Sequence, residues 1–252
     1  MACWELAAPR RDLTLSKLRR WGGNLGIVVV NTMVMRLLFP ILAVGAAVWA
    51  QQNGWGLFNL ITLPGWVEVA AAAILLDLAI YWQHRLFHMI PLFWRLHRMH
   101  HADRDFDVTT ALRFHPLEII VSIVIKLGLV LILGPAALAV LIFEVLLNGT
   151  AMFNHANVHL PLGLDRWLRL VVVTPDMHRV HHSVENGEFN RNFGFNLPWW
   201  DRLFGSYKAQ PDRGHEEMEI GLHAYGAGVC ANLLWMLVLP IKAIEDEPND
   251  QG

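Results

Sequence analysis

Apolar and polar positions alternate in long blocks along the chain: two apolar regions, each followed by a polar region rich in histidine. The first apolar region contains two runs, 25–49 and 66–82, joined by a short loop with Gly and Asn. At about 1.5 Å per residue, a run of this length crosses, or nearly crosses, a hydrocarbon core of about 30 Å. The pattern predicts a first hairpin of two membrane-spanning helices over residues 25–83.

The second apolar region predicts another hairpin, over residues 116–153. It is interrupted by Gly134-Pro135, which favours a tight turn between two helices over one continuous helix. Two charged residues lie inside these helices, Lys126 and Glu144. At membrane depth they can pair, snorkel or face a cavity.

The polar regions and the C-terminal part complete the predicted architecture. Residues 84–115 form the first histidine-rich region, and 154–225 are mixed polar and aromatic, which predicts short helices that cap the site. Residues 226–244 are apolar enough for a membrane-associated helix, whether or not it spans, and the tail EDEPNDQG is predicted to be disordered. We predict an all-α integral membrane protein, a single membrane domain over 1–252 with about four transmembrane helices in two hairpins and a cytoplasmic histidine-rich helical cap.

Composition supports the membrane interpretation. Of 252 residues, 54% are hydrophobic and 17% charged, and the mean hydropathy is +0.35, a profile unlike that of a soluble globule. The net charge of about −2 gives no electrostatic case for nucleic acid as a partner. Cys3 and Cys230 form no CxxC motif. The N-terminus lacks the apolar core of a cleavable signal peptide, so the first spanning helix is expected to be an uncleaved anchor.

Basic residues predict the orientation. Five lie in the N-terminal segment, five arginines lie within 84–115, and the loops at the other ends of the hairpins contain no Lys or Arg. Because loops rich in Lys and Arg stay in the cytoplasm, we predict that the N-terminus and all histidine clusters are cytoplasmic. The protein is then a multi-pass protein of the bacterial inner membrane or the endoplasmic reticulum.

Ten of the thirteen histidines fall in four clusters with spacings of three or four residues. On a helix these spacings place side chains on one face. Imidazole is a common ligand of iron, zinc and copper, and one ion takes about four to six donors. A lone histidine in an apolar chain usually packs or forms a hydrogen bond, but this repeated pattern predicts two metal ions. The predicted ligands are His84, His88, His97, His100, His101, His155, His159, His178, His181 and His182.

Other polar residues receive different predictions. His115 precedes Pro116 at the start of the third spanning helix and is predicted to be a structural hydrogen-bonding residue, whereas His215 and His223 are predicted to lie on the surface. Acids near the clusters are candidates to accept hydrogen bonds from the imidazole N–H groups, and at least one or two are predicted to reach a ligand. The candidates are Asp77, Asp103, Asp107, Asp176 and Glu185.

The chemistry of such a site leaves several functions open. Nitrogen-rich sites beside a membrane suit iron that activates oxygen, although zinc accepts the same ligands. A zinc-dependent lipid hydrolase is an alternative, but a catalytic zinc normally needs about three protein ligands. A metal transporter is a further alternative, although its ligands should lie inside the spanning helices rather than at or beyond their ends. Unactivated C–H bonds of a lipid chain require a strong oxidant, which favours an oxygen-dependent enzyme.

The motifs themselves resemble one family. HRLFH at 84–88, HRMHH at 97–101 and HRVHH at 178–182 look like the histidine boxes of the fatty acid hydroxylase and sterol desaturase superfamily of membrane di-iron enzymes. RFHPLE, NRNFG, DLAIYWQHRLFH and WWDRLFGSY add to the resemblance, which covers Asp77 to Tyr207, roughly half of the chain.

The resemblance implies two iron ions, O2 as co-substrate, electrons from an external donor and a lipid substrate. It assigns the metal-ligand role to the same ten histidines, without deciding which histidine binds which ion. No heme, flavin or nicotinamide domain is recognisable in the sequence. We therefore expect the electrons to come from a separate redox protein, either cytochrome b5-like or a ferredoxin with its reductase.

Overall fold

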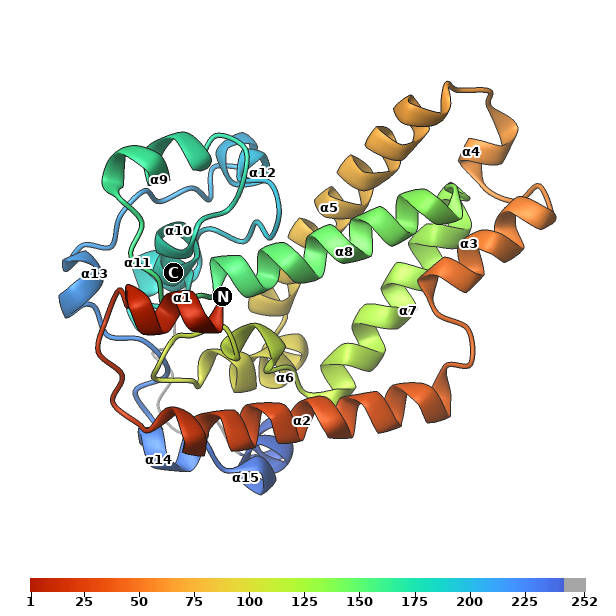
Figure 1. The fold of residues 1–252 in the computed structure, drawn as a ribbon. Helices are drawn as coiled ribbons and strands as arrows, with labels where there is room; N and C mark the ends of the chain where they lie inside the picture. The colour runs from red at the N-terminus through yellow and green to blue at the C-terminus, as the bar shows by residue number, and fades with distance from the viewer. Residues whose placement is uncertain (243–252) are drawn as a thin grey trace.

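Helices make up the regular structure of the part of the chain that the computed structural model describes, residues 1–242. The chain has a compact half built of short helices and an elongated half built of long ones (Figure 1). Within the described residues, β-structure is limited to isolated bridges such as Pro9 with Val158. The predicted all-α class is confirmed.

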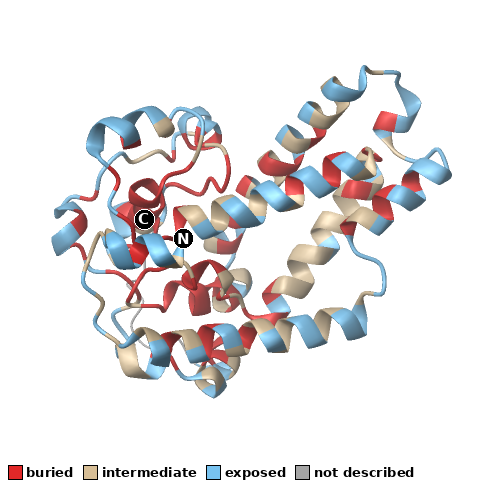
Figure 2. Ribbon diagram, in the orientation of Figure 1, coloured by how far each residue is buried: buried red, intermediate tan, exposed pale blue. Residues whose placement is uncertain are grey.

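Long apolar helices form the elongated half: α2 (Lys17–Leu38), α5 (Gly65–Met89), α7 (Pro116–Leu133) and α8 (Ala137–Asn154). Four segments are long and apolar enough to cross a membrane, and each contains one of these helices. Figure 2 shows that buried residues gather in the compact half, whereas α2, α5 and α8 carry exposed and intermediate residues along much of their length. Exposed apolar helix surface of this extent is what a lipid bilayer covers, as expected for a multi-pass membrane protein.

The first apolar segment is not the single straight helix that was predicted over 25–49, so that prediction was wrong. Helix α2 ends at Leu38, and a new helix, α3 (Ala43–Gln52), begins after a short break, followed by α4 (Leu57–Leu60). Pro40 lies in the break, where it lacks an N–H group and disfavours helical geometry at the residue before it. The chain therefore turns, and α3 packs against α7 and α8 (Figure 1).

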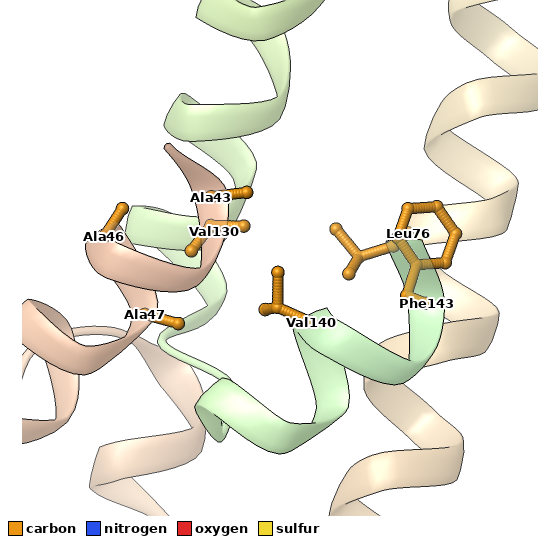
Figure 3. Close-up of a cluster of buried hydrophobic side chains, with 7 residues drawn as sticks. All are labelled: Ala43, Ala46, Ala47, Leu76, Val130, Val140 and Phe143. Carbon is orange, nitrogen blue, oxygen red and sulfur yellow. The ribbon is translucent and has the colours of Figure 1, made fainter. Parts of the chain in front are cut away.

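Small side chains allow this close packing in the elongated half. Three alanines of α3 lie near larger apolar residues of α5, α7 and α8 (Figure 3). Without a hydrophobic driving force between helices in lipid, such small residues let helix backbones approach and gain van der Waals contact. The cluster consists of Ala43, Ala46, Ala47, Leu76, Val130, Val140 and Phe143.

The turn between α7 and α8 confirms the predicted hairpin at Gly134-Pro135. Gly134 has a left-handed conformation, with φ of 59°, and ends α7. Gly134 also lies against Gly56, where an added Cβ would clash with the Gly134 nitrogen. Glycine is required at Gly56 by this close approach, and both chain reversals of the elongated half meet here.

The compact half begins with α1 (Ala2–Ala7) and α6 (Pro91–His101) and continues with the 3₁₀ helix η1 (Thr110–Leu112). Short helices lie within 154–225, as predicted, while the boundaries of this cap and its cytoplasmic side stay predictions. These helices are α9 (Leu162–Leu168), α10 (Pro175–His181), α11 (Asn186–Phe189), α12 (Trp199–Leu203) and α13 (Gly214–Glu217).

The C-terminal part is not the single helix that was predicted over 226–244. It contains α14 (Ala227–Cys230), α15 (Leu233–Val238) and the 3₁₀ helix η2 (Leu239–Ile241), and none of these is a candidate span. Cys230, Met236 and Leu239 are buried with residues of α2 and α6. Residues 243–252, which include the end of the predicted helix and the whole EDEPNDQG tail, lie outside the described residues.

Candidate metal centre

Nine of the ten clustered histidines come together in two groups at the junction of the two halves. Within each group the potential ligand atoms lie within 4.8 Å of one another and are buried. His159, the tenth, is exposed and lies outside both groups, so its predicted ligand role has no geometric support. The first group is His84, His88, His97, His101 and His181, and the second is His100, His155, His178 and His182.

The helical spacing explains how each group is assembled. His84 and His88 lie one turn apart near the end of α5, and His155 is the C-cap residue directly after α8. In HRMHH on α6, His97 and His101 share one group, and in HRVHH on α10 the outer pair shares the other. In each motif the two histidines four apart share a helix face and a group, while the middle histidine belongs to the other group. The middle residues, His100 and His181, therefore cross into the opposite groups and bind the two groups into one unit.

Neighbouring oxygen atoms fix five of the rings. The Nδ1 atoms of His84 and His97 lie 2.8 Å from the Phe193 carbonyl oxygen and 2.6 Å from Glu118 Oε1. The Nδ1 atoms of His100, His155 and His181 each face a backbone carbonyl oxygen in the same way. A carbonyl oxygen only accepts, so Nδ1 of those rings carries the proton and Nε2 presents its lone pair.

These lone pairs face one another. His84 Nε2 lies 3.2 Å from His97 Nε2 in the first group, and His155 Nε2 lies 3.1 Å from His100 Nε2 in the second. Two bare nitrogen lone pairs at this distance repel, but two nitrogens bound at about 2.1 Å and at right angles to one cation stand about 3 Å apart. The donor geometry of both groups therefore fits a metal ion.

Unpartnered nitrogens support the same conclusion. His101 Nε2 and His181 Nε2 are buried without a hydrogen-bond partner, as are both ring nitrogens of His88 and His182. Buried polar atoms without partners are costly, and a shared cation satisfies several at once. Burial also lowers the imidazole pKa, to about 3 for His97 and His155, so the rings of the compact half are neutral at pH 7, the form that binds metal.

The acid whose side chain reaches a clustered imidazole is Glu118, which was not among the five acids predicted for this role. Glu118 lies three residues after His115 in RFHPLE, in the first turn of α7, and its side chain is buried. In the described chain none of the five predicted acids has a hydrogen bond to a clustered imidazole. The sequence signal that marks Glu118 is a carboxylate at the start of an otherwise apolar spanning helix.

Asp77, one of the predicted acids, and Asp201, which was not predicted, act on a histidine indirectly. Asp77 accepts from Trp200 Nε1 at 2.8 Å and from the backbone N–H of Leu197 at 3.3 Å. Asp201 accepts from the N–H groups of Phe193 and Gly194, at 2.8 and 2.9 Å, and burial raises its pKa to about 6. Together these carboxylates hold the loop whose Phe193 carbonyl orients His84.

The remaining acids stabilise the compact half. Asp103 and Asp107 form ion pairs with the buried Arg20 of α2. These ion pairs connect α2 to the histidine-rich region 84–115. Asp176 pairs with Arg179 between the histidines of α10, and desolvation of that guanidinium lowers its pKa to about 10. Glu185 is exposed, and the prediction that at least one or two of the five acids reach a clustered imidazole was wrong for the described residues.

The three unclustered histidines lie outside both groups. His115 caps α7, because its Nδ1 accepts from the Leu117 N–H at 3.2 Å, which confirms its structural role. His223 is exposed, as predicted. His215 was predicted to be a surface residue but is buried and bonded to Gln210, 2.8 Å away, because the loop before α13 folds over it.

A cavity of about 500 Å³ adjoins the first group and extends into the elongated half. His84 and His97 line one end of it, and residues of α2, α5, α7 and α8 line the rest. The cavity is thus open to a ligand that occupies the membrane region and reaches the histidines.

Comparison with known proteins gives a consistent result. A model of the fatty acid hydroxylase family matches residues 69–206. Human alkylglycerol monooxygenase is 31% identical over 178 residues, which is 70% of this chain and 38% of that protein. Ornithine lipid hydroxylase OlsE of Rhizobium tropici is 30% identical, over 68% of this chain and 48% of that protein. Methylsterol monooxygenase 2-2 of Arabidopsis thaliana is 27% identical, over 75% of this chain and 66% of that protein.

The chain spans about two fifths of the length of the alkylglycerol monooxygenases it matches. No solved structure matches it. The matched region, 69–206, includes all nine histidines of the two groups.

Proposed function

The chain belongs to the fatty acid hydroxylase family, and from that premise we propose that it is a membrane-bound, O2-dependent oxidoreductase that hydroxylates a C–H bond of a lipid. Nine histidines hold two iron ions in this proposal, five in the first group and four in the second. The names of the similar proteins, which are monooxygenases and a hydroxylase, favour hydroxylation over desaturation.

One observation carries the proposal. Two buried groups of neutral imidazoles, with lone pairs that face one another at 3.1 to 3.2 Å, adjoin a cavity between membrane-spanning helices. Iron bound there would supply the oxidising power that an unactivated lipid C–H bond requires, with O2 as oxidant and electrons from an external donor. The proposed metal site and the cavity through which a lipid would reach it therefore lie next to each other.

The protein residues position the reacting parts. The carbonyl oxygens and Glu118 orient the imidazoles, which would fix the metal geometry. Phe87, Phe114 and Phe195 line the cavity next to His84 and His97 and exclude water from the reacting carbon. Exclusion of water protects an oxidising site from side reactions.

We further propose that the histidine groups face the cytoplasm and that a cytochrome b5-like protein or a ferredoxin with its reductase delivers the electrons. The membrane is the bacterial inner membrane or the endoplasmic reticulum. Basic residues near α2 and within 84–115 support this orientation.

The decisive experiment uses the full chain purified anaerobically in mild detergent. We expect two iron ions per chain, and conversion of lipid that requires both O2 and a reductant. Hydrolysis of the lipid without O2 consumption, by protein that contains zinc, would identify the zinc-dependent hydrolase instead. Intact, folded protein that binds one iron ion or none would contradict the assignment of two groups.

A further inference from the structure

Charged side chains line the part of the cavity that lies in the elongated half. Arg36 of α2, Lys126 of α7 and Glu144 of α8 all border it. Each lies within a candidate membrane span. Ionisable residues inside spanning segments are costly, and those that face a cavity generally mark a binding site or a pathway.

The charges of these three cavity-lining side chains do not cancel. Lys126 Nζ lies 2.8 Å from Glu144 Oε1, so this pair is neutral overall. Arg36 is exposed to the cavity and its surroundings and has no ion pair or hydrogen bond among the interactions found in residues 1–242. One positive charge therefore remains without a counter-charge from the protein.

Two unpartnered amide oxygens add to the polar lining. Gln83 donates to Ser122 Oγ at 2.9 Å and Asn31 donates to the Phe114 carbonyl at 2.9 Å, but the Oδ1 of Asn31 and the Oε1 of Gln83 are buried without partners. Buried acceptors of this kind cost free energy unless a donor reaches them. The cavity is built to hold polar atoms as well as a hydrocarbon chain.

The Lys126–Glu144 pair lies at a distance from the histidines along α7. Glu118, Ser122 and Lys126 are four residues apart and lie along one face of α7, and all three line the cavity. At 1.5 Å per residue, Lys126 stands about 12 Å along α7 from Glu118, which contacts His97. A ligand that extends from the charged side chains to the histidines must be elongated and must have polar and apolar parts.

We propose that the cavity selects lipids with an anionic group, a carboxylate or a phosphate, which Arg36 binds in the part of the cavity that lies in the elongated half. This inference rests on the proposed function and specifies its substrate class. The hydrocarbon chain then extends toward His84 and His97, so the carbon that is oxidised lies several bonds away from the anionic group.

The first test measures binding in metal-free protein and is therefore independent of turnover. The purified full chain is titrated with three lipids that share a palmitoyl chain: palmitic acid, palmitoyl lysophosphatidic acid and the neutral monopalmitoyl glycerol. Displacement of a fluorescent fatty acid reports the affinity. We expect Arg36→Gln to weaken binding of the anionic lipids by about 10- to 100-fold, as for loss of a charge-assisted hydrogen bond, and to leave the neutral lipid nearly unchanged.

Arg166→Gln is the matched control, because Arg166 is an exposed arginine of α9 that lies away from the cavity lining. Arg36→Met is the second variant. It removes a charge that makes no internal contact, and a spanning helix accommodates methionine readily. Whichever of the two anionic lipids binds more tightly to the protein without substitutions identifies carboxylate or phosphate as the preferred anionic group.

The second test measures kcat/KM for the same lipids with iron-loaded protein, reductant and O2. A loss confined to the anionic lipids in both Arg36 variants supports the inference. Equal binding of anionic lipids by the variants and the unchanged protein would overturn it and would mean that Arg36 only extends toward the membrane surface. Failure of every lipid to be oxidised, with Arg36-dependent binding intact, would contradict the proposed function and leave this inference standing.

Discussion

The hydrogen bond between Glu118 and His97 offers a direct test of the first metal group. Glu118 Oε1 lies 2.6 Å from His97 Nδ1, and both residues are buried. The bond holds the ring so that Nε2 points at His84 Nε2. Glu118→Ala removes the acceptor and leaves a buried N–H without a partner.

The magnitude follows from this contact by two routes. A buried donor left without a partner costs about 1 to 3 kcal/mol, and loss of a side chain that orients a metal-ligating histidine costs about 10- to 100-fold in metal affinity. At about 1.4 kcal/mol per factor of ten, the two ranges agree. Glu118→Gln keeps an oxygen acceptor and should lose less than Glu118→Ala.

The assay is competition between metal-free protein and a chelator for ferrous iron under anaerobic conditions. Glu118→Ala should lose iron from the five-histidine group first, because no histidine of the second group contacts Glu118, so the stoichiometry should fall from two toward one. Glu68→Gln is the control. Glu68 also lies in a spanning helix and accepts from the Ala136 N–H at 2.7 Å, at the far end of the hairpins. Unchanged iron affinity in Glu118→Ala, or equal weakening of both groups, would refute the reasoning.

Three further predictions concern the ligands, the pH dependence and the orientation. His100→Ala should abolish O2-dependent lipid conversion, whereas His159→Ala should retain most of it, because only the former lies in a metal group; inactivity of both variants at matched expression and folding would argue against the assignment. The folded-state pKa of His97 and His155 is about 3, below the ordinary value of about 6.5, so the unfolded chain binds protons first as the pH falls. The midpoint temperature of thermal unfolding of metal-free protein in detergent should therefore decrease as the pH is lowered from about 6.5 toward 3, and an increase in that pH window would contradict the linkage. A cysteine introduced at Asn186 should react with an impermeant reagent only from the cytoplasmic side, and labelling from the outside alone would reverse the predicted topology.

The sequence determined the membrane architecture because hydropathy and helix length act locally. Apolar runs of sufficient length fix the spanning segments, and Gly134-Pro135 fixes the turn between α7 and α8. Pro40 was equally visible in the sequence, but the straight helix predicted across it was wrong. Pro40 explains the break itself, but the direction in which the chain continues depends on α3 packing its alanines against α7 and α8, a long-range contact that hydropathy does not report.

Histidine spacing likewise determined that imidazoles share helix faces, and nine of the ten were brought together. The division into five and four was decided by tertiary structure, since the crossing of His100 and His181 depends on how α6 and α10 face each other. His159 follows the same spacing as true cluster members, but α8 ends at Asn154 and the chain beyond it is extended, so a helical rule no longer applies there.

The partners of the rings were also decided by the tertiary structure. Most are backbone carbonyl oxygens, such as those of Phe193 and Arg191, which every residue carries and no sequence pattern marks. Glu118 is distant from His97 in the chain and reaches it only because α7 packs beside α6. The sequence alone thus indicates the kinds of side chain that can bind a metal and the helices that carry them. The packing of those helices determines which atoms lie in contact, because contacts between distant segments depend on the whole fold.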